Sequence, residues 1–243
     1  MREFETGATK GRVPAIKQML QERVAHGLYK PGARLPSERQ FCEEFQTTRV
    51  TLHESLMQLE AEGLIYREER RGWFVSPARF IYNPQSRGHF TQAARLQGRV
   101  PATTLIDKRI VPASPRVAQC LDLPPGTPMG RIRRVRSIDG RAVLYVEHYY
   151  QAQVFPGLFE HDLSVSLTEL YRDVYGFQYG RMKYQITPAA VSGDAASELR
   201  LADGSPALLV TRINYGLDNG IRDCDFEYWR HDAVLIEVDV AEP

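Results

Sequence analysis

Hydrophobic residues in the first quarter of the chain recur with the spacing of helices. In the first such segment they follow the order i, i+3, i+4 and i+8: Ile16, Met19, Leu20 and Val24. This spacing marks one face of a helix and predicts a helix over residues 14–26, with Pro14 in its first turn. Ser37 then offers an N-cap for a short second helix, because Gln40 completes a capping box. Thr48 caps a third helix that runs to about residue 62.

Two short β-prone segments follow the third helix. Residues 64–67 and 73–75 flank a charged tip and predict a β-hairpin. Three helices followed by a two-stranded wing give the order of a winged helix-turn-helix.

The rest of the chain has the pattern of a sheet. Long β-prone segments are separated by turn signals and lie at residues 103–111, 129–138, 142–150, 179–191, 207–215, 221–230 and 234–240. Asp139-Gly140 and Asn219-Gly220 each predict a hairpin that joins neighbouring strands in antiparallel fashion. Short helices are expected at residues 115–121, 166–175 and 194–201. The predicted fold class is α+β, with a winged helix-turn-helix over residues 1–76, a linker over 77–88 and an antiparallel-sheet domain over 89–243.

Composition narrows the class of protein further. The 243 residues are 43% hydrophobic and 25% charged, as in ordinary globular domains, and the net charge of +1 favours no class of partner. No apolar run reaches the roughly 20 residues that cross a bilayer. The first residues are acidic where a signal peptide would be apolar, so we expect a cytoplasmic protein with no membrane partner. Cys42, Cys120 and Cys224 lie too far apart in the sequence for a disulfide framework or a zinc site.

Motifs of enzyme chemistry are absent from the sequence. It has no Gly-rich phosphate loop, nucleophile elbow or HExxH motif, and its six histidines lack ligand-like spacing. We therefore expect neither an enzyme nor a bound metal or cofactor.

The N-terminal motifs resemble the DNA-binding domain of the GntR family of bacterial regulators. They are Pro-Gly-x-x-Leu-Pro-Ser-Glu-Arg at residues 31–39, Thr-Arg-x-Thr at 48–51 and Glu-Gly-Leu-Ile at 62–65. The resemblance covers residues 12–75 and includes the turn, cap and helix elements at the expected spacing.

The C-terminal part resembles the effector domain of the HutC subfamily, the UTRA domain, whose fold is related to chorismate lyase. The resemblance rests on Gly98, Arg-Val-Arg at residues 134–136, Ser-Val-Ser-Leu at 164–167 and Tyr-Trp-Arg-x-Asp at 228–232. Within that subfamily, residues 70–75 and 227–232 look most like a regulator of 2-aminoethylphosphonate utilisation.

The predicted third helix carries residues suited to DNA. Thr48, Arg49 and Thr51 place one guanidinium and two hydroxyls on its first turn, where arginine can pair with guanine and hydroxyls with phosphate. The family resemblance adds Arg39 as a second contact, although an ion pair with Glu43 is an alternative role. Thr48 has the alternative role of a helix cap alone.

The predicted wing and one helix position add further candidates. Arg70 and Arg71 at the wing tip would reach a phosphate or the minor groove, unless Glu68 and Glu69 neutralise them. In similar regulators an arginine is common at the position of His53, and a glycine at that of Arg70. Both differences bear on which operator sequence is read.

Candidate ligand residues lie in the predicted sheet. Strand alternation sends Arg134 and Arg136 to one face, where paired guanidiniums suit phosphate or phosphonate, although salt bridges across a solvated face are the alternative. Ser164 and Ser166 precede a helix and add anion-binding groups. The resemblance implies that these four positions hold an anionic effector group.

An aminophosphonate also needs an acceptor for its ammonium group. The candidates are Glu147, Asp225 and Glu227, with Asp223 beside them, although acids on one strand are often its wet side. The resemblance adds Thr91 as a pocket residue.

The sequence thus predicts a transcription regulator that binds a palindromic double-stranded DNA operator as a homodimer. Its affinity for DNA is expected to depend on a small anionic metabolite, such as 2-aminoethylphosphonate or a related phosphate ester, and its mode to be repression. Alternatives are an effector from amino-sugar or amino-acid catabolism, a ligand-converting enzyme on a chorismate-lyase-like fold, and an architectural DNA-binding protein.

Overall fold

The computed structural model describes residues 5–86 and 89–240. The chain divides into two compact units, Met1–Arg79 and Phe80–Pro243. Among the described residues, no helix has both the length and the apolar character needed to span a membrane.

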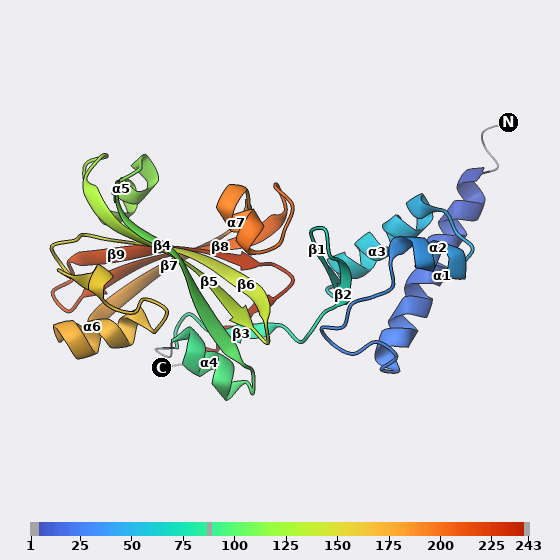
Figure 1. Cartoon of the computed structure of the whole chain (residues 1–243), viewed down its shortest axis with the longest axis horizontal. Coiled ribbons are helices and arrows are strands. Elements are labelled where there is room, and N and C mark those ends of the chain that lie inside the picture. The colour runs from blue at the N-terminus through green and yellow to red at the C-terminus, as the bar shows by residue number, and fades with distance from the viewer. Residues whose placement is uncertain (1–4, 87–88, 241–243) are drawn as a thin grey trace. The chain divides into compact units, whose positions relative to one another are not determined.

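The N-terminal unit has the predicted order of elements (Figure 1). Its elements are α1 (Glu5–Ala25), α2 (Glu38–Glu44), α3 (Arg49–Ala61), β1 (Ile65–Glu68) and β2 (Gly72–Val75). The apolar stripes of the three helices pack on the hairpin in one core that includes Leu20, Phe41, Leu52, Leu56 and Trp73.

The first helix begins earlier than predicted. α1 starts at Glu5, so that Pro14 lies inside the helix and not in its first turn. The residues before Pro14 are mostly polar or small and have no apolar stripe, and the periodicity therefore could not reveal this part of the helix.

The C-terminal unit is built on one six-stranded antiparallel sheet with the order β4-β5-β6-β9-β8-β7. The bounds of these strands are β4 (Pro101–Pro112), β5 (Pro128–Ile138), β6 (Arg141–Tyr150), β7 (Tyr179–Ala190), β8 (Pro206–Gly216) and β9 (Ile221–Arg230). The hairpins predicted at residues 139–140 and 219–220 are confirmed, because they join β5 to β6 and β8 to β9. Asp139 and Gly140 both have the positive φ angles that a tight hairpin turn requires.

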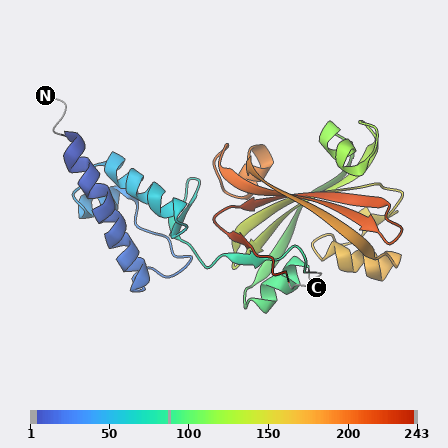
Figure 2. The ribbon, with the colours of Figure 1, turned by 180° about the vertical axis from the view of Figure 1, so that it is seen from behind.

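Short helices cover both faces of this sheet. They are α4 (Phe90–Leu96), α5 (Pro115–Leu121), α6 (Leu167–Tyr175) and α7 (Gly193–Glu198), with a 3₁₀ turn η1 (Leu158–Glu160). Figures 1 and 2, which show opposite sides, place α5 and α7 over one face and α4 and α6 over the other. The strand residues that alternate between the two faces therefore enter different hydrophobic clusters.

The segment predicted as a linker contains a strand. β3 (Phe80–Tyr82) pairs in parallel with β10 (Val234–Ile236), and β10 is shorter than the strand predicted over residues 234–240. Phe80 is 2% exposed and its ring stacks on Trp229, with the two centroids 5.8 Å apart. Apolar packing thus attaches residues 80–82 to the sheet domain. The prolines and glycines around these residues predicted a linker and gave no sign of this strand.

Candidate functional site

The leading turn of α3 is organised by a side-chain cap. Thr48 has extended backbone angles, and its Oγ1 accepts a hydrogen bond from the amide of Thr51 at 3.3 Å. Thr51 is only 2% exposed, and its own Oγ1 lies 3.0 Å from that of Thr48. The structure therefore places Thr51 on the buried face of α3, which corrects its prediction as a DNA contact. Its hydroxyl completes the cap at the helix start.

The exposed face of α3 begins with Arg49 and Val50. Arg49 is exposed, and Val50 is 73% exposed although it is apolar. His53 lies on the same face with 46% of its side chain exposed, and its ring packs edge-on against Trp73. The sequence analysis did not predict Val50 as a DNA contact. An apolar residue outside the buried stripe of a helix could have indicated an exposed contact residue.

The other predicted DNA contacts differ in their exposure and in their ion pairs within the protein. Arg39 is 81% exposed, with its Nε 3.6 Å from Glu43, so the ion pair is present but solvated. Arg70 is 91% exposed at the wing tip and has a positive φ of 59°, a backbone conformation that favours glycine. Arg71 is ion-paired with the buried Glu68, so the neutralisation considered as an alternative applies to it most directly.

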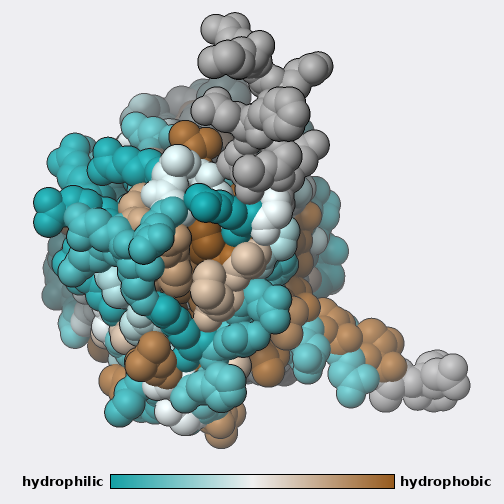
Figure 3. Space-filling model, turned by 90° about the vertical axis from the view of Figure 1, so that its right-hand side faces the viewer, coloured by the Kyte–Doolittle hydropathy of each residue, from teal (hydrophilic) through white to brown (hydrophobic). Residues whose placement is uncertain are grey.

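The face of the molecule in Figure 3 is mostly hydrophilic, with hydrophobic residues near its middle and along a stretch at the lower right. Exposed large hydrophobic residues of the N-terminal unit are scattered along the sequence: Met19, Leu28, Val50 and Met57. Single apolar residues of this kind are normal on protein surfaces. Of the four, Val50 is the one on the first turn of α3.

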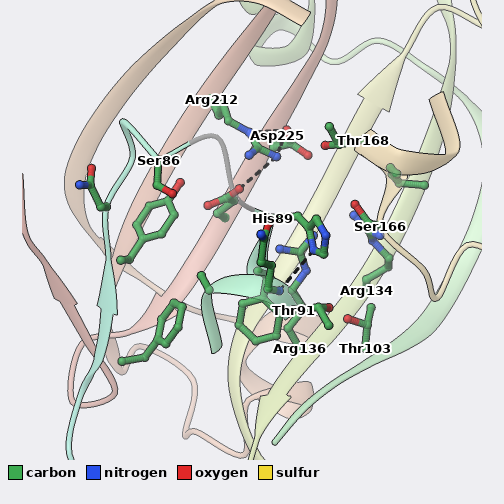
Figure 4. A pocket seen from close by; sticks show the side chains of 18 of the residues that line it. Ser86, His89, Thr91, Thr103, Arg134, Arg136, Ser166, Thr168, Arg212 and Asp225 are labelled. Carbon is green, nitrogen blue, oxygen red and sulfur yellow. Dashed lines mark hydrogen bonds and ion pairs between the residues drawn. The ribbon is translucent and has the colours of Figure 1, made fainter. Parts of the chain in front are cut away.

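A cavity of about 620 Å³ lies in the C-terminal unit, over the face of the sheet that α4 and α6 cover (Figure 4). Its walls include Thr91 from α4, Arg134 and Arg136 from β5, and Ser166 from the start of α6. These four predicted ligand residues therefore line one cavity, together with Asp225 and Glu227 of β9, although they come from different parts of the chain.

Neither Arg134 nor Arg136 forms an ion pair with a carboxylate in the part of the chain that the structure describes. Arg134 is 2% exposed, and its Nη1 donates to the backbone oxygens of Leu163 and Val165 at 3.4 and 3.1 Å. The Nε atoms of both arginines are buried and donate no hydrogen bond to any of the described residues. Burial, together with the charge of Arg136, lowers the pKa of Arg134 to about 9. An anion in the cavity would therefore relieve an unfavourable pair of like charges.

The start of α6 supplies further polar groups. Ser166 is its N-cap and accepts a hydrogen bond from the amide of Glu169 at 3.4 Å. The first turn of a helix favours negative charge because its amide groups point outward. Ser164 does not line the cavity, which corrects its prediction: its amide and hydroxyl both bond to Asp162, at 2.9 and 2.7 Å.

The predicted acidic residues already have partners inside the protein. Asp225 and Glu227 line the cavity, but Nη2 of Arg212 lies 2.8 Å from Asp225 and 3.4 Å from Glu227. Neither is an unengaged acceptor for a ligand ammonium group, contrary to the prediction. If the two lining histidines are left aside, three guanidiniums face two carboxylates, so one positive charge in the cavity is uncompensated. Sequence reasoning missed Arg212.

Glu147 lies on the other face of the sheet. Its strand neighbour His148 lines the cavity, and alternation therefore turns Glu147 away from it. There it pairs across the strands with Arg133 and accepts a hydrogen bond from Tyr149 at 3.4 Å. The prediction of Glu147 as an effector contact is thus wrong.

One group of residues has the composition of a metal site. Among the described residues, His148, Asp223 and Asp225 bring ligand atoms within 4.8 Å of one another, all of them buried. Their carboxylate oxygens, however, already accept hydrogen bonds; the donors are His148, Tyr179, Arg212 and Asn214. Burial raises the pKa of Asp225, but the charges of Arg212 and His148 hold it well below its usual range. The chemistry of this cluster therefore fits a hydrogen-bond network that orients Arg212, and a metal ion does not fit it.

His148 connects this network to α6. With an ionised Asp225, His148 Nδ1 donates to the carboxylate at 2.9 Å, and Nε2 lies 2.7 Å from the hydroxyl of Tyr171, within hydrogen-bond distance. Tyr171 belongs to the helix whose first turn lines the cavity. The acidic wall of the cavity, formed by Asp225 and Glu227, is therefore joined to α6 by one chain of buried hydrogen bonds.

Two family models match the chain. The UTRA domain matches residues 96–234, and the model described as bacterial regulatory proteins of the gntR family matches residues 13–75. The uncharacterised HTH-type transcriptional regulator YihL of Escherichia coli K12 is 33% identical over 91% of this chain and 94% of its own length. The HTH-type transcriptional repressor NagR of Bacillus subtilis is 28% identical over 84% of each chain.

A solved structure shares the fold. The crystal structure of PhnF from Mycobacterium smegmatis aligns with a TM-score of 0.65 and 24% identity, and covers 94% of this chain and 100% of that chain. The order of a winged helix-turn-helix followed by an antiparallel-sheet domain is therefore found in an experimental structure as well.

Proposed function

Because the chain belongs to the GntR family of bacterial regulatory proteins and carries a UTRA domain, we propose that it is a repressor controlled by a small anionic metabolite. In this proposal the protein binds a palindromic operator as a homodimer in the cytoplasm, and the metabolite occupies the cavity of the C-terminal unit. Repression is supported by NagR, a relative described as a repressor.

The observation that carries the proposal is the pair of arginines on one face of β5: Arg134, which is buried, and Arg136, which is half-buried. Both point into the cavity (Figure 4), and their Nε donors have no partner among the described residues. Buried donors of this kind are costly unless a partner arrives. A tetrahedral oxyanion offers several acceptor oxygens at once and can bind both guanidiniums and the first turn of α6 together.

The cavity residues other than Arg134 and Arg136 indicate which chemical groups the rest of the effector carries. Hydroxyl groups of Ser86, Thr91, Thr103 and Thr168 line the cavity, whereas both carboxylates are engaged by Arg212. This favours a phosphonate or phosphate ester as the effector class. 2-Aminoethylphosphonate is the first member to test, and its ammonium group would have to compete with Arg212 for a carboxylate.

For DNA, we propose that the leading turn of α3 enters the major groove. Arg49 would pair with guanine, the exposed Val50 would contact a thymine methyl group, and Arg39 and Arg70 would contact the backbone. One winged helix covers a single half-site, so two-fold pairing doubles the contacts and matches a palindrome.

Thermal melting with candidate ligands tests the effector site. Inorganic phosphate, 2-aminoethylphosphonate, ethylphosphonate and an amino-sugar phosphate are compared on the full chain. We expect at least one of them to raise the melting temperature, because ligand that binds only the folded state stabilises it. Arg136→Ala should abolish this shift.

Arg131→Ala is the matched control, because it removes an arginine of the same strand from the opposite face, where Arg131 pairs with Asp107. It should lower the melting temperature itself but keep the shift caused by ligand. A shift that persists in Arg136→Ala, or no shift with any of these anions, would contradict the proposed site. The same ligand should release the protein from a fragment of its own promoter region.

A further inference from the structure

Helix α5 packs on the face of the sheet that lies away from the cavity. The guanidinium of Arg116 in α5 lies 3.8 Å from the centroid of the Phe226 ring. Its Nη1 also donates to the hydroxyl of Tyr228 at 3.0 Å. Both partners are on β9, so one row of α5 side chains lies against one row of β9 side chains.

The same two rows contain two of the three cysteines. Cys120 is four residues after Arg116 and therefore shares its face of α5. Cys224 is two residues before Phe226 and therefore shares its face of β9. The two thiols meet in one apolar cluster, in which Cys224 is a buried member and Cys120 packs against the buried residues. The sequence separation of more than a hundred residues had suggested unrelated cysteines.

We propose that Cys120 and Cys224 form an oxidisable dithiol that hydrogen peroxide converts into an intramolecular disulfide. The Cys120 thiolate attacks one peroxide oxygen, the O–O bond breaks, and Cys120 becomes a sulfenic acid while hydroxide leaves. The sulfur of Cys224 then attacks the sulfenic sulfur, and its proton leaves with the hydroxyl group as water. Two thiols are thereby oxidised and one peroxide is reduced to two molecules of water.

The environments of the two thiols fit these separate roles. Cys120 is partly exposed, whereas Cys224 is fully buried. The hydrogen bond from Cys224, opposed by burial and aided by the charges of Arg116 and Lys183, lowers the pKa of Cys120 to about 7. The same hydrogen bond and burial raise the pKa of Cys224. Cys120 is therefore the accessible thiolate, and Cys224 is the thiol that resolves it.

The position of Cys224 connects this dithiol to the sheet that carries the cavity. Asp223 and Asp225 flank it in β9, and their side chains enter the hydrogen-bond network on the other face. A disulfide would tether α5 to the strand that supplies the acidic wall. The inference itself stands on the contacts between α5 and β9 and does not depend on the identity of the effector or the operator.

Peptide mapping of the full chain tests the proposal. The reduced protein is treated with one equivalent of hydrogen peroxide, alkylated and digested with trypsin without reductant. We expect the peptide of residues 117–131 linked to that of residues 223–230, and the number of free thiols to fall from three to one. Sulfinic acid at Cys120 without this linkage, or a disulfide that includes Cys42 or joins two chains, would overturn the proposal.

Variants separate the two roles. Cys42→Ser, in the other unit, is the matched control and should form the linked peptide like the unmodified chain. Cys120→Ser should keep both remaining thiols, and Cys224→Ala should accumulate a sulfenic acid at Cys120 that dimedone traps. The initial rate of thiol loss should rise as the pH passes through about 7, since Arg116, Lys183 and Cys224 face the Cys120 thiolate. A rate that does not change with pH would contradict the assignment of Cys120 as the nucleophile.

Discussion

At the scale of single residues, the first turn of α3 contains two side chains that bond within the protein and two that are exposed to solvent. Thr48 and Thr51 bond to each other and to the helix backbone, whereas Arg49 and Val50 are exposed. Because the cap satisfies a backbone donor internally, the direction in which the two exposed side chains leave the helix is fixed before any partner binds. The readout of bases is therefore expected to rest on Arg49 and Val50.

Arg49→Ala should weaken operator binding by about 1–3 kcal/mol and relax the preference for guanine at one position. The loss follows from the bidentate pairing that a guanidinium makes with a guanine edge. Competition binding with operator and scrambled duplexes measures both effects. Arg39→Ala serves for comparison, because a backbone contact should weaken binding to both duplexes alike. An Arg49→Ala variant that still prefers guanine there would contradict the assignment.

Val50 provides a test with altered DNA. Replacing the contacted thymine by uracil removes one methyl group and should cost about 0.8 kcal/mol, roughly fourfold in affinity. In Val50→Ala the same replacement should change the affinity little, because the apolar partner is gone. Measuring both proteins on both duplexes gives a double-mutant cycle. Equal sensitivity of the two proteins to uracil would remove Val50 from the contact.

At the scale of elements, β4 shows how an irregular register creates an ion-pair cluster. The pairing of β4 with β5 shifts between Leu105 and Asp107, and Asp107 then stands opposite Arg133. Its carboxylate is 2.7 Å from Arg133 Nε and 3.1 Å from Arg131 Nη2. On the other face of β5, the Nε atoms of Arg134 and Arg136 have no such partner within residues 5–86 and 89–240. One strand thus holds neutralised and unneutralised arginines on opposite faces.

This cluster predicts an acid-dependent stability. Burial opposes the ionised form of Asp107, but the hydrogen bond from Arg133 and the charge of Arg131 lower its pKa to about 2. A carboxyl with a depressed pKa stabilises the fold above its unfolded pKa of about 3.9, and this stabilisation is lost as the pH falls towards 2. Asp107→Asn should therefore melt at a lower temperature than the unmodified chain at pH 6, and the difference should shrink from pH 4 downwards. A difference that does not vary with pH would contradict this view of Asp107.

The elements also show which parts of the structure can be predicted from the sequence. The cap at Thr48 and the turn at Asp139 are local signals, and both elements were predicted. Thr51 was predicted on the exposed face of α3, but it is buried. It is next to Leu52 in the sequence, and a position at the border of the apolar stripe can be buried or exposed, depending on how the neighbouring helices pack. Arg212 and the pairing of Cys120 with Cys224 depend on strands and helices that are distant in the sequence. No local pattern carries that information.

At the scale of the whole molecule, affinity for DNA should depend on salt and on the symmetry of the operator. Release of counterions from phosphates makes the logarithm of affinity fall linearly with the logarithm of salt concentration. A dimer on a palindrome makes about twice the phosphate contacts of one winged helix, so its slope should be about twice that on an isolated half-site. Titrations at several salt concentrations, with light scattering to determine the oligomeric state, measure both. Equal slopes on the two duplexes would contradict dimeric binding.

The parallel pair of β3 and β10 has a mechanical consequence. β3 is the first element after Arg79, and it is held by β10 and by the stacking of Phe80 on Trp229. A pulling force applied between the N-terminal end of β3 and the C-terminal end of β10 would load the hydrogen bonds of this pair in shear, because the two strands run parallel and would be pulled from opposite ends. Because Trp229 lies in the central strand β9, the stacked rings attach this pair to the middle of the sheet and not to one of its edges.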